Sequence, residues 1–170
     1  MKAESAQPLP RVGGIDLTSI EPDTRARMSG PGLRTFRSIS DKWGLSESQR
    51  RTLLGGPSRS TYHQWIKNAE NDEKVTLHLD TLLRISAVLG VHKALGILFV
   101  RESEALAWLK GPHAGPLFGG QSPMALMLSG TQDGILQVRR YLDAWRGGLR
   151  GAPAADSGVP PVTRDDLVFV

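Results

Sequence analysis

The sequence has 170 residues, enough for one domain or for two small ones with tails, and 39% of them are hydrophobic, which suffices for a core. It contains no cysteine, so disulfide bonds and thiolate metal sites are excluded, as suits a reducing cytoplasm. The net charge of +4 is modest, and the lack of a signal peptide or of an apolar run near the ~20 residues of a membrane span predicts a soluble cytoplasmic protein without a membrane partner.

Residues 1–30 contain prolines and glycines without sustained hydrophobic periodicity, and we expect them to form a flexible, mostly disordered extension. In the next segment, 32–43, Leu33, Phe36, Ile39 and Trp43 have the spacing of one helical face. Gly44 follows and is suited to end this helix. Residues 31–74 are therefore predicted to form the first folded region.

Two short helices separated by a tight turn are predicted within residues 46–69. Ser46 begins the first helix, Gly55-Gly56-Pro57 forces the turn, and Ser58 caps the second helix. The inward face of the second helix is expected to consist of Tyr62, Trp65, Ile66 and Ala69. Two short helices around a glycine-containing turn are typical of a helix-turn-helix region, in which the second helix reads DNA.

The basic residues are concentrated in this region. Between Pro31 and Lys67, seven Lys and Arg residues stand against two acidic ones, a net charge of +5 where the whole chain has +4. Such a segment favours an anionic partner, and operator DNA is the first hypothesis. The residues predicted to contact DNA are Arg59, Ser60, Thr61, His63, Gln64 and Lys67. The alternative is that these residues form an ordinary solvated helix face.

Residues 75–110 are predicted to form a helical core and dimerisation region. Two strongly apolar helices are expected, one over 77–89 that is closed by Gly90 and one over 91–100, followed by a short helix over 102–110. The apolar surface of the first two is broader than one small domain needs, which favours dimerisation. The residues predicted for the dimer contact are Leu79, Leu82, Leu83, Leu95 and Leu98.

Residues 111–148 are predicted to form a helical hairpin. Ser122 is suited to cap a short helix that has Pro123 in its first turn, and Gly130 is suited to stop it in a left-handed conformation. Gly147-Gly148 ends the second, longer helix. The apolar stripe of that helix consists of Ile135, Val138, Leu142 and Trp145.

The order of residues in this hairpin, LFGGQSPMALMLSG followed by VRRYLDAW, resembles the toxin-binding domain of the Xre/MbcA/ParS family of bacterial antitoxins. The matching positions are Phe118-Gly119-Gly120, Ser122-Pro123, Gly130, Gly134, Val138 and Tyr141-Leu142. The resemblance extends over residues 33 to 148 and implies an all-α antitoxin, in which a helix-turn-helix region precedes a helical toxin-binding domain. It also implies a homodimer within a larger toxin–antitoxin complex.

The resemblance implies the partner and its mode of inhibition as well. The toxin would be of the RES type, which degrades NAD; the antitoxin would block its active-site entrance, and the complex would repress its own promoter. The toxin contacts expected from the hairpin are Leu117, Phe118, Gly119, Gly120, Arg139 and Arg140.

The tail, residues 149–170, is rich in small residues and proline and is predicted to be extended, but its last residues are apolar. Exposing such an end is unfavourable, so the tail either docks in a partner or folds back on its own chain. For the first case the predicted toxin contacts are Arg164, Phe169 and Val170.

No pattern predicts catalysis, a metal site or a cofactor. The four histidines lack metal-ligand spacing such as HExxH, and the glycine-rich phosphate-binding loops are missing. We therefore predict an antitoxin that blocks a toxin and autoregulates its operon. The alternative is a plain helix-turn-helix regulator or partitioning-type protein whose C-terminal half only dimerises or binds another protein.

Overall fold

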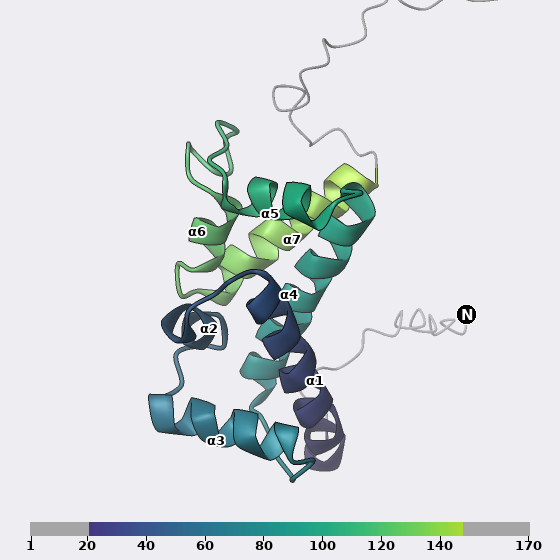
Figure 1. Cartoon of the computed structure of the whole chain (residues 1–170), viewed down its shortest axis with the longest axis vertical. Helices are drawn as coiled ribbons and strands as arrows, with labels where there is room; N and C mark the ends of the chain where they lie inside the picture. Colours follow the sequence, from purple (N-terminus) through teal and green to yellow (C-terminus); the bar gives the residue numbers. More distant parts are fainter. Residues whose placement is uncertain (1–20, 148–170) are drawn as a thin grey trace, which may run out of the picture.

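The computed structural model describes residues 21–147, which form seven helices with short connections (Figure 1). In chain order these are α1 (Pro22–Lys42), α2 (Glu47–Leu53), α3 (Arg59–Glu70), α4 (Leu79–Leu98), α5 (Glu102–Lys110), α6 (Pro123–Met127) and α7 (Gln132–Arg146). Within this range no residue lies in a β-strand, so the prediction of an all-α fold is confirmed.

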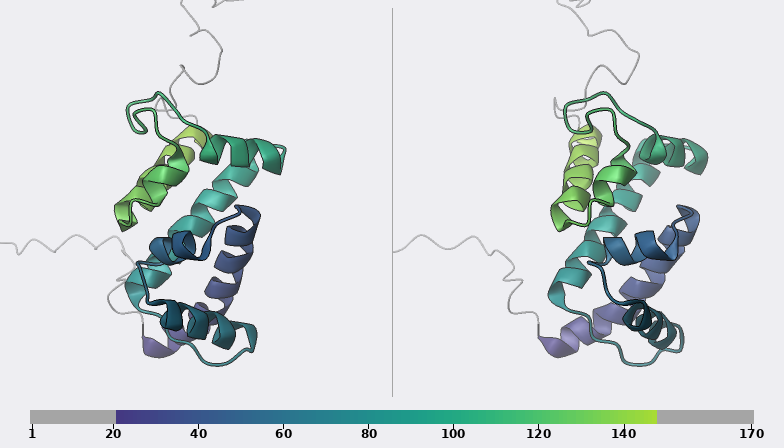
Figure 2. Two further views of the ribbon diagram at one scale, coloured as in Figure 1. Left: turned by 60° about the vertical axis from the view of Figure 1, so that its left-hand side comes forward. Right: turned by 90° about the vertical axis from the view of Figure 1, so that its left-hand side faces the viewer.

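The other helices are arranged around α4. It packs against both α1 and α7, so that α1–α3 surround the end where α4 begins and α5–α7 surround the end where it finishes (Figures 1 and 2). Val88, Val91 and Leu95 of α4 are buried. The prediction that no apolar run comes near the length of a membrane span is wrong, because α4 could cross a membrane by length and composition alone, with a mean hydropathy of 1.4 over its apolar window. In this fold it is instead the core helix that both halves of the molecule share.

The prediction of two helices separated at Gly90 is wrong, because α4 continues through Gly90 to Leu98. A Cβ atom at Gly90 would lie only 2.7 Å from Nε of Arg139, whose side chain crosses α4 at this point from α7. Gly90 therefore leaves room for the side chain of Arg139 to lie across α4 and does not end a helix.

The start of α1 also differs from the prediction. α1 begins at Pro22, in a first-turn position that tolerates proline, so the expectation of a disordered extension to residue 30 is wrong for residues 22–30. The buried Ser29 explains the longer helix: its Oγ donates to the carbonyl of Arg25 (2.7 Å) and accepts from the backbone N–H of Leu77 (3.0 Å). This contact ties the first half of α1 to the segment before α4. Residues 1–20 lie outside the described range.

The inward face predicted for α1 is confirmed. Leu33, Phe36, Ile39 and Trp43 are all buried. Gly44 has a φ of 64°, a left-handed conformation that favours glycine, and it follows the last residues of the helix as expected. Only the start of this element differs from the prediction.

Candidate nucleic-acid and protein interfaces

The geometry of α2, the turn and α3 agrees with the predicted helix-turn-helix. Ser46 caps α2, because its Oγ accepts from the backbone N–H of Gln49 (3.3 Å) while Oε1 of Gln49 accepts from the N–H of Ser46 (2.9 Å). Gly55 and Gly56 have φ values of 95° and 76°, so the turn needs both glycines. Ser58 then caps α3 by accepting from the N–H of Thr61 at 3.1 Å.

α3 turns one face inward and one outward. Tyr62, Ile66 and Ala69 are buried, whereas Trp65 is half-buried at the edge of the core. The residues predicted to contact DNA are all exposed on this helix: Arg59, Ser60, Thr61, His63, Gln64 and Lys67. The structure therefore brings them together on one accessible surface, and their contact with DNA stays a prediction.

An acidic residue that the sequence did not single out contacts this surface. Glu47, the first residue of α2, holds Arg59 and His63 with one carboxylate oxygen each: Oε1 lies 3.0 Å from Nε of Arg59, and Oε2 lies 3.1 Å from Nε2 of His63. The three residues belong to two helices, so their contact depends on how α2 and α3 are placed across the turn. Nothing in the spacing of the sequence indicates it.

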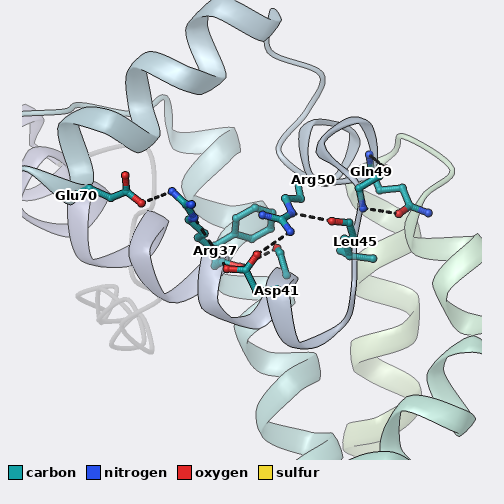
Figure 3. Close-up of polar contacts among 9 residues, drawn as sticks. Arg37, Asp41, Leu45, Gln49, Arg50 and Glu70 are labelled. Carbon is teal, nitrogen blue, oxygen red and sulfur yellow. Dashed lines mark hydrogen bonds and ion pairs between the residues drawn. The ribbon is translucent and has the colours of Figure 1, made fainter.

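A second polar network fixes the three N-terminal helices relative to one another (Figure 3). Arg37 of α1 pairs with Glu70 of α3, while Arg50 of α2 pairs with Asp41 of α1 through Nη2 and Oδ1 (2.7 Å). Nε of Arg50 also donates to the carbonyl of Leu45 at 2.9 Å. These contacts hold α3 in place against α1 and α2.

Most of the arginines in this region bind acidic side chains or backbone carbonyls of the same chain. Arg34 donates to the carbonyl of Ala69 (2.6 Å) and pairs with Asp72 (2.7 Å), and Arg51 donates to the carbonyl of Pro57 (2.9 Å). Together with the two arginines of Figure 3, these basic residues bind partners within the fold. Much of the positive charge in this region therefore stabilises the helix-turn-helix, and the exposed side of α3 is the surface that remains available to DNA.

The loop that leads into the hairpin presents glycines and buries its aromatic ring. Gly119 and Gly120 are exposed, with φ values of 55° and 86°. Phe118 is only 5% exposed and packs against Trp108 and Tyr141, with ring centroids 6.0 and 5.1 Å away. Phe118 was predicted as a toxin contact, but its side chain belongs to the aromatic core under the loop. Leu117 is half-buried beside it.

The hairpin itself has the predicted caps and apolar stripe. The hydroxyl of Ser122 accepts from the N–H of Ala125 (3.1 Å) at the start of α6, and Gly130 is left-handed, with a φ of 88°. Gly134 lies where α7 meets α6, since a Cβ there would be 2.3 Å from the carbonyl oxygen of Leu126. The stripe of α7 has three buried residues and one half-buried residue, in order Ile135, Val138, Leu142 and Trp145.

The two arginines predicted for toxin binding have different surroundings. Arg140 is exposed, its Nη1 3.6 Å from Oδ1 of Asp133. Arg139 is half-buried across Gly90, with Nε 3.7 Å from Oδ2 of Asp143, so its first role is to pack α7 on α4. The remaining predicted contacts, Arg164, Phe169 and Val170, lie outside the described residues.

The predicted dimer contact is only partly accessible. Leu82 and Leu95 are 8% and 2% exposed, because α4 turns them into the chain's own core, and this leaves them little surface for the predicted dimer contact. Leu79, Leu83 and Leu98 are half-buried, and their role in a dimer stays a prediction. Ile97 and Val100 are 54% and 99% exposed and add apolar surface near the end of α4 that the sequence prediction did not include.

Metal ligands do not cluster in the part of the chain that the structure describes. Among residues 21–147, no group of three or more His, Asp or Glu side chains is placed to hold a metal ion. The pKa of His92 is lowered, first by burial and then by the nearby Lys42, which both disfavour the protonated ring. His92 lies beside Trp43, away from the exposed face of α3.

Two family models match the chain, one on each half of the fold. Residues 24–91 match the antitoxin Xre-like helix-turn-helix domain, and residues 94–148 match the antitoxin Xre/MbcA/ParS C-terminal toxin-binding domain. A curated relative, the uncharacterized protein y4oB of Sinorhizobium fredii (strain NBRC 101917 / NGR234), is 42% identical over 116 residues, which are 68% of this chain and 84% of the relative. Both matched domains point to a regulatory protein and not to an enzyme.

Proposed function

Because the chain belongs to the Xre family of antitoxins, we propose that it neutralises a RES-type toxin that degrades NAD and that it represses its own operon in the cytoplasm. One observation carries the proposal. The two matched domains, a helix-turn-helix and a toxin-binding domain, occupy opposite ends of one helical body and share α4. A molecule of this shape can bind DNA at one end and a protein at the other.

At the DNA end, α3 enters the major groove. Its exposed face offers Arg59 and Gln64 as donors and acceptors for base edges, while Ser60, Thr61 and Lys67 contact phosphates. The capped, glycine-containing turn and the arginine network fix the angle of α3 before binding, so little ordering is needed on DNA.

At the toxin end, the loop around Gly119-Gly120 and the exposed Arg140 contact the rim of the toxin's active site. The buried Phe118 supports that loop from below. Residues 160–170 extend the contact in this proposal: burying Leu167 and Phe169 in the toxin at about 1.5–3 kcal/mol each offsets the entropy cost of holding a segment in one conformation. Arg164 supplies charge in a site built for a dinucleotide.

A homodimer within the toxin–antitoxin complex completes the proposal. Operators read by helix-turn-helix proteins usually have two half-sites, so a dimer places two copies of α3 one helical turn of DNA apart. The half-buried Leu79, Leu83 and Leu98, together with the exposed Ile97 and Val100, supply apolar surface for the contact. Light scattering at micromolar concentration tests this, and a monomer at that concentration contradicts it.

The function is tested with the purified chain and the product of the neighbouring gene. NAD consumption is measured while the toxin is titrated with wild-type chain, Arg140→Glu, Lys67→Glu and a chain shortened by residues 160–170. We expect Arg140→Glu and the shortened chain to leave residual NAD breakdown, and Lys67→Glu to inhibit fully but to bind DNA weakly. Lys67→Glu is the matched control, because it makes the same charge change at the other end of the molecule.

The possible outcomes separate the proposal from its alternative. Full inhibition by the shortened chain assigns blocking to the hairpin alone. If the wild-type chain neither inhibits nor forms a complex with the neighbouring gene's product, while it still binds DNA, the plain helix-turn-helix regulator takes the place of the antitoxin.

A further inference from the structure

We propose that Glu47 is a positioning residue for sequence recognition, which fixes the orientation in which Arg59 and His63 meet a base pair. The inference rests on the proposed DNA binding by α3 and adds to it a residue that lies on a different helix. It also assigns the base that Arg59 reads, a guanine, and the edge of the guanidinium group that reads it.

The carboxylate of Glu47 contacts two residues that lie one turn apart on α3. Arg59 and His63 are four residues apart, so they lie on the same side of the helix, and each is about 3 Å from a different oxygen of Glu47 (3.0 and 3.1 Å). The side chain of Glu47 is 33% exposed, whereas that of Arg59 is 74% exposed. The carboxylate is thus the more enclosed partner, and it restrains a long side chain that is otherwise surrounded by solvent.

The contact selects which donors of Arg59 remain available. Glu47 engages Nε, the donor nearest the chain, which leaves the hydrogens on Nη1 and Nη2 at the far end of the guanidinium group. Two parallel N–H donors at that end match N7 and O6 of guanine, the pair of acceptors that guanine presents in the major groove. Arg59 held in this way should therefore read guanine end-on with both terminal nitrogens.

His63 is restrained by the second oxygen. Its Nε2 lies 3.1 Å from Oε2 of Glu47, so Nε2 is the ring nitrogen that contacts the carboxylate and Nδ1 is the one that Glu47 does not contact. Glu47 thereby fixes the ring orientation one turn further along α3. One carboxylate therefore contacts two side chains that lie one turn apart on α3.

The negative charge of Glu47 gives the proposal a distinctive signature. A carboxylate at the DNA-facing surface repels phosphates, so it lowers affinity for any duplex, while its contacts with Arg59 and His63 raise discrimination between sequences. Removing only the charge should therefore change the two properties in opposite directions. A residue that merely supported the fold would lower both together.

The experiment uses the full-length chain and fluorescence anisotropy. The probes are a duplex selected by the wild-type chain from a random library, a scrambled duplex, and copies of the selected duplex in which one guanine at a time is replaced by 7-deazaguanine, which lacks the N7 acceptor. The variants are Glu47→Gln, Arg59→Ala and the double variant. Glu102→Gln on α5 is the control, because it removes one carboxylate at the other end of the molecule.

For Glu47→Gln we expect binding to the scrambled duplex at least as tight as that of the wild type, and a loss of about tenfold in discrimination, within the range of one bidentate base contact. One 7-deazaguanine should weaken the wild type, and that penalty should be absent in both Glu47→Gln and Arg59→Ala. In the Arg59→Ala background, Glu47→Gln should change the penalty no further. Glu102→Gln should behave as the wild type.

Two results overturn the inference. One is a Glu47→Gln variant that keeps both the discrimination and the 7-deazaguanine penalty. The other is a variant that loses affinity for both duplexes equally, with a lower unfolding midpoint, which assigns a structural role only. Failure of the proposed function is seen earlier and separately, since the wild-type chain would then select no duplex from the library.

Discussion

Phe118 occupies a position of the hairpin motif, yet its ring is buried and its two neighbouring glycines are exposed. In the sequence, a phenylalanine beside glycines in a loop resembles a contact residue. Its burial depends on Trp108 and Tyr141, which reach it from α5 and α7. The side chain therefore supports the proposed contact loop from the core. Its removal should lower the stability of the fold and should not remove a direct contact with a partner.

Replacing Phe118 with alanine should lower the free energy of unfolding by about 3–5 kcal/mol, the range for removing a buried aromatic ring. Urea unfolding followed by circular dichroism measures this loss. Leu117→Ala is the control, because the neighbouring side chain is only half-buried and should cost less. Equal, small losses for both variants would contradict the assignment of Phe118 to the core.

His92 predicts how stability depends on pH. Burial and Lys42 lower its pKa in the folded chain, so between pH 7.5 and 5.5 the unfolded chain takes up a proton more readily than the folded one. Stability should therefore fall as the pH falls through the usual pKa of histidine. Thermal unfolding at both pH values measures the effect, and His92→Gln should reduce the difference between them. An unchanged difference in that variant would assign the pH dependence to other groups.

At the scale of helices, the sequence predicted correctly those features that depend on residues close together in the chain. Ser58 and Ser122 were expected as caps, and Ser46 was expected to begin a helix; all three are caps, because a cap depends on residues within one turn. The start of α1 and the continuity of α4 were missed, because they depend on contacts with distant segments. The same reason applies to the site: the polar spacing of α3 predicted its outward face, whereas the contacts of Glu47 required the placement of α2.

Gly90 and Gly96 make a matched pair within α4. A glycine-to-alanine change inside a helix usually stabilises by about 0.5–1 kcal/mol. Gly96→Ala should show this gain, since no neighbouring atom lies within 4 Å of the position that its new methyl group would take. Gly90→Ala should show none, because Arg139 lies 2.7 Å from the corresponding position. In an Arg139→Ala background the gain should return at Gly90. Denaturant unfolding of the wild type and the four variants decides, and equal gains at both glycines would contradict close packing at Gly90.

At the scale of the whole molecule, α4 makes the two halves one folding unit. α1 packs on it from the DNA end and α7 from the toxin end, so neither half has a complete core without it. A fragment that begins at residue 76 would uncover the face of α4 on which α1 packs. Variants of the full-length chain are therefore better suited than excised halves to separate the two proposed functions.

Calorimetry should accordingly show a single unfolding transition. Phe36→Ala, which removes a fully buried ring in α1, should move that whole transition to lower temperature, whereas Met28→Ala, at a side chain that is 52% exposed, should move it little. Two separated transitions in Phe36→Ala, with the second at the wild-type temperature, would show that the halves unfold independently.

Because α4 is continuous, it also fixes the angle by which the two matched domains are rotated relative to each other about the helix axis. The matched domains meet between residues 91 and 94, inside this helix and not in a linker. Inserting one residue there would turn one end relative to the other by about 100° and lengthen the helix by about 1.5 Å. Seven residues would nearly restore the angle but add about 10 Å. Related sequences can therefore gain or lose residues in their loops, whereas an insertion within α4 would change the orientation of a bound protein relative to the DNA axis.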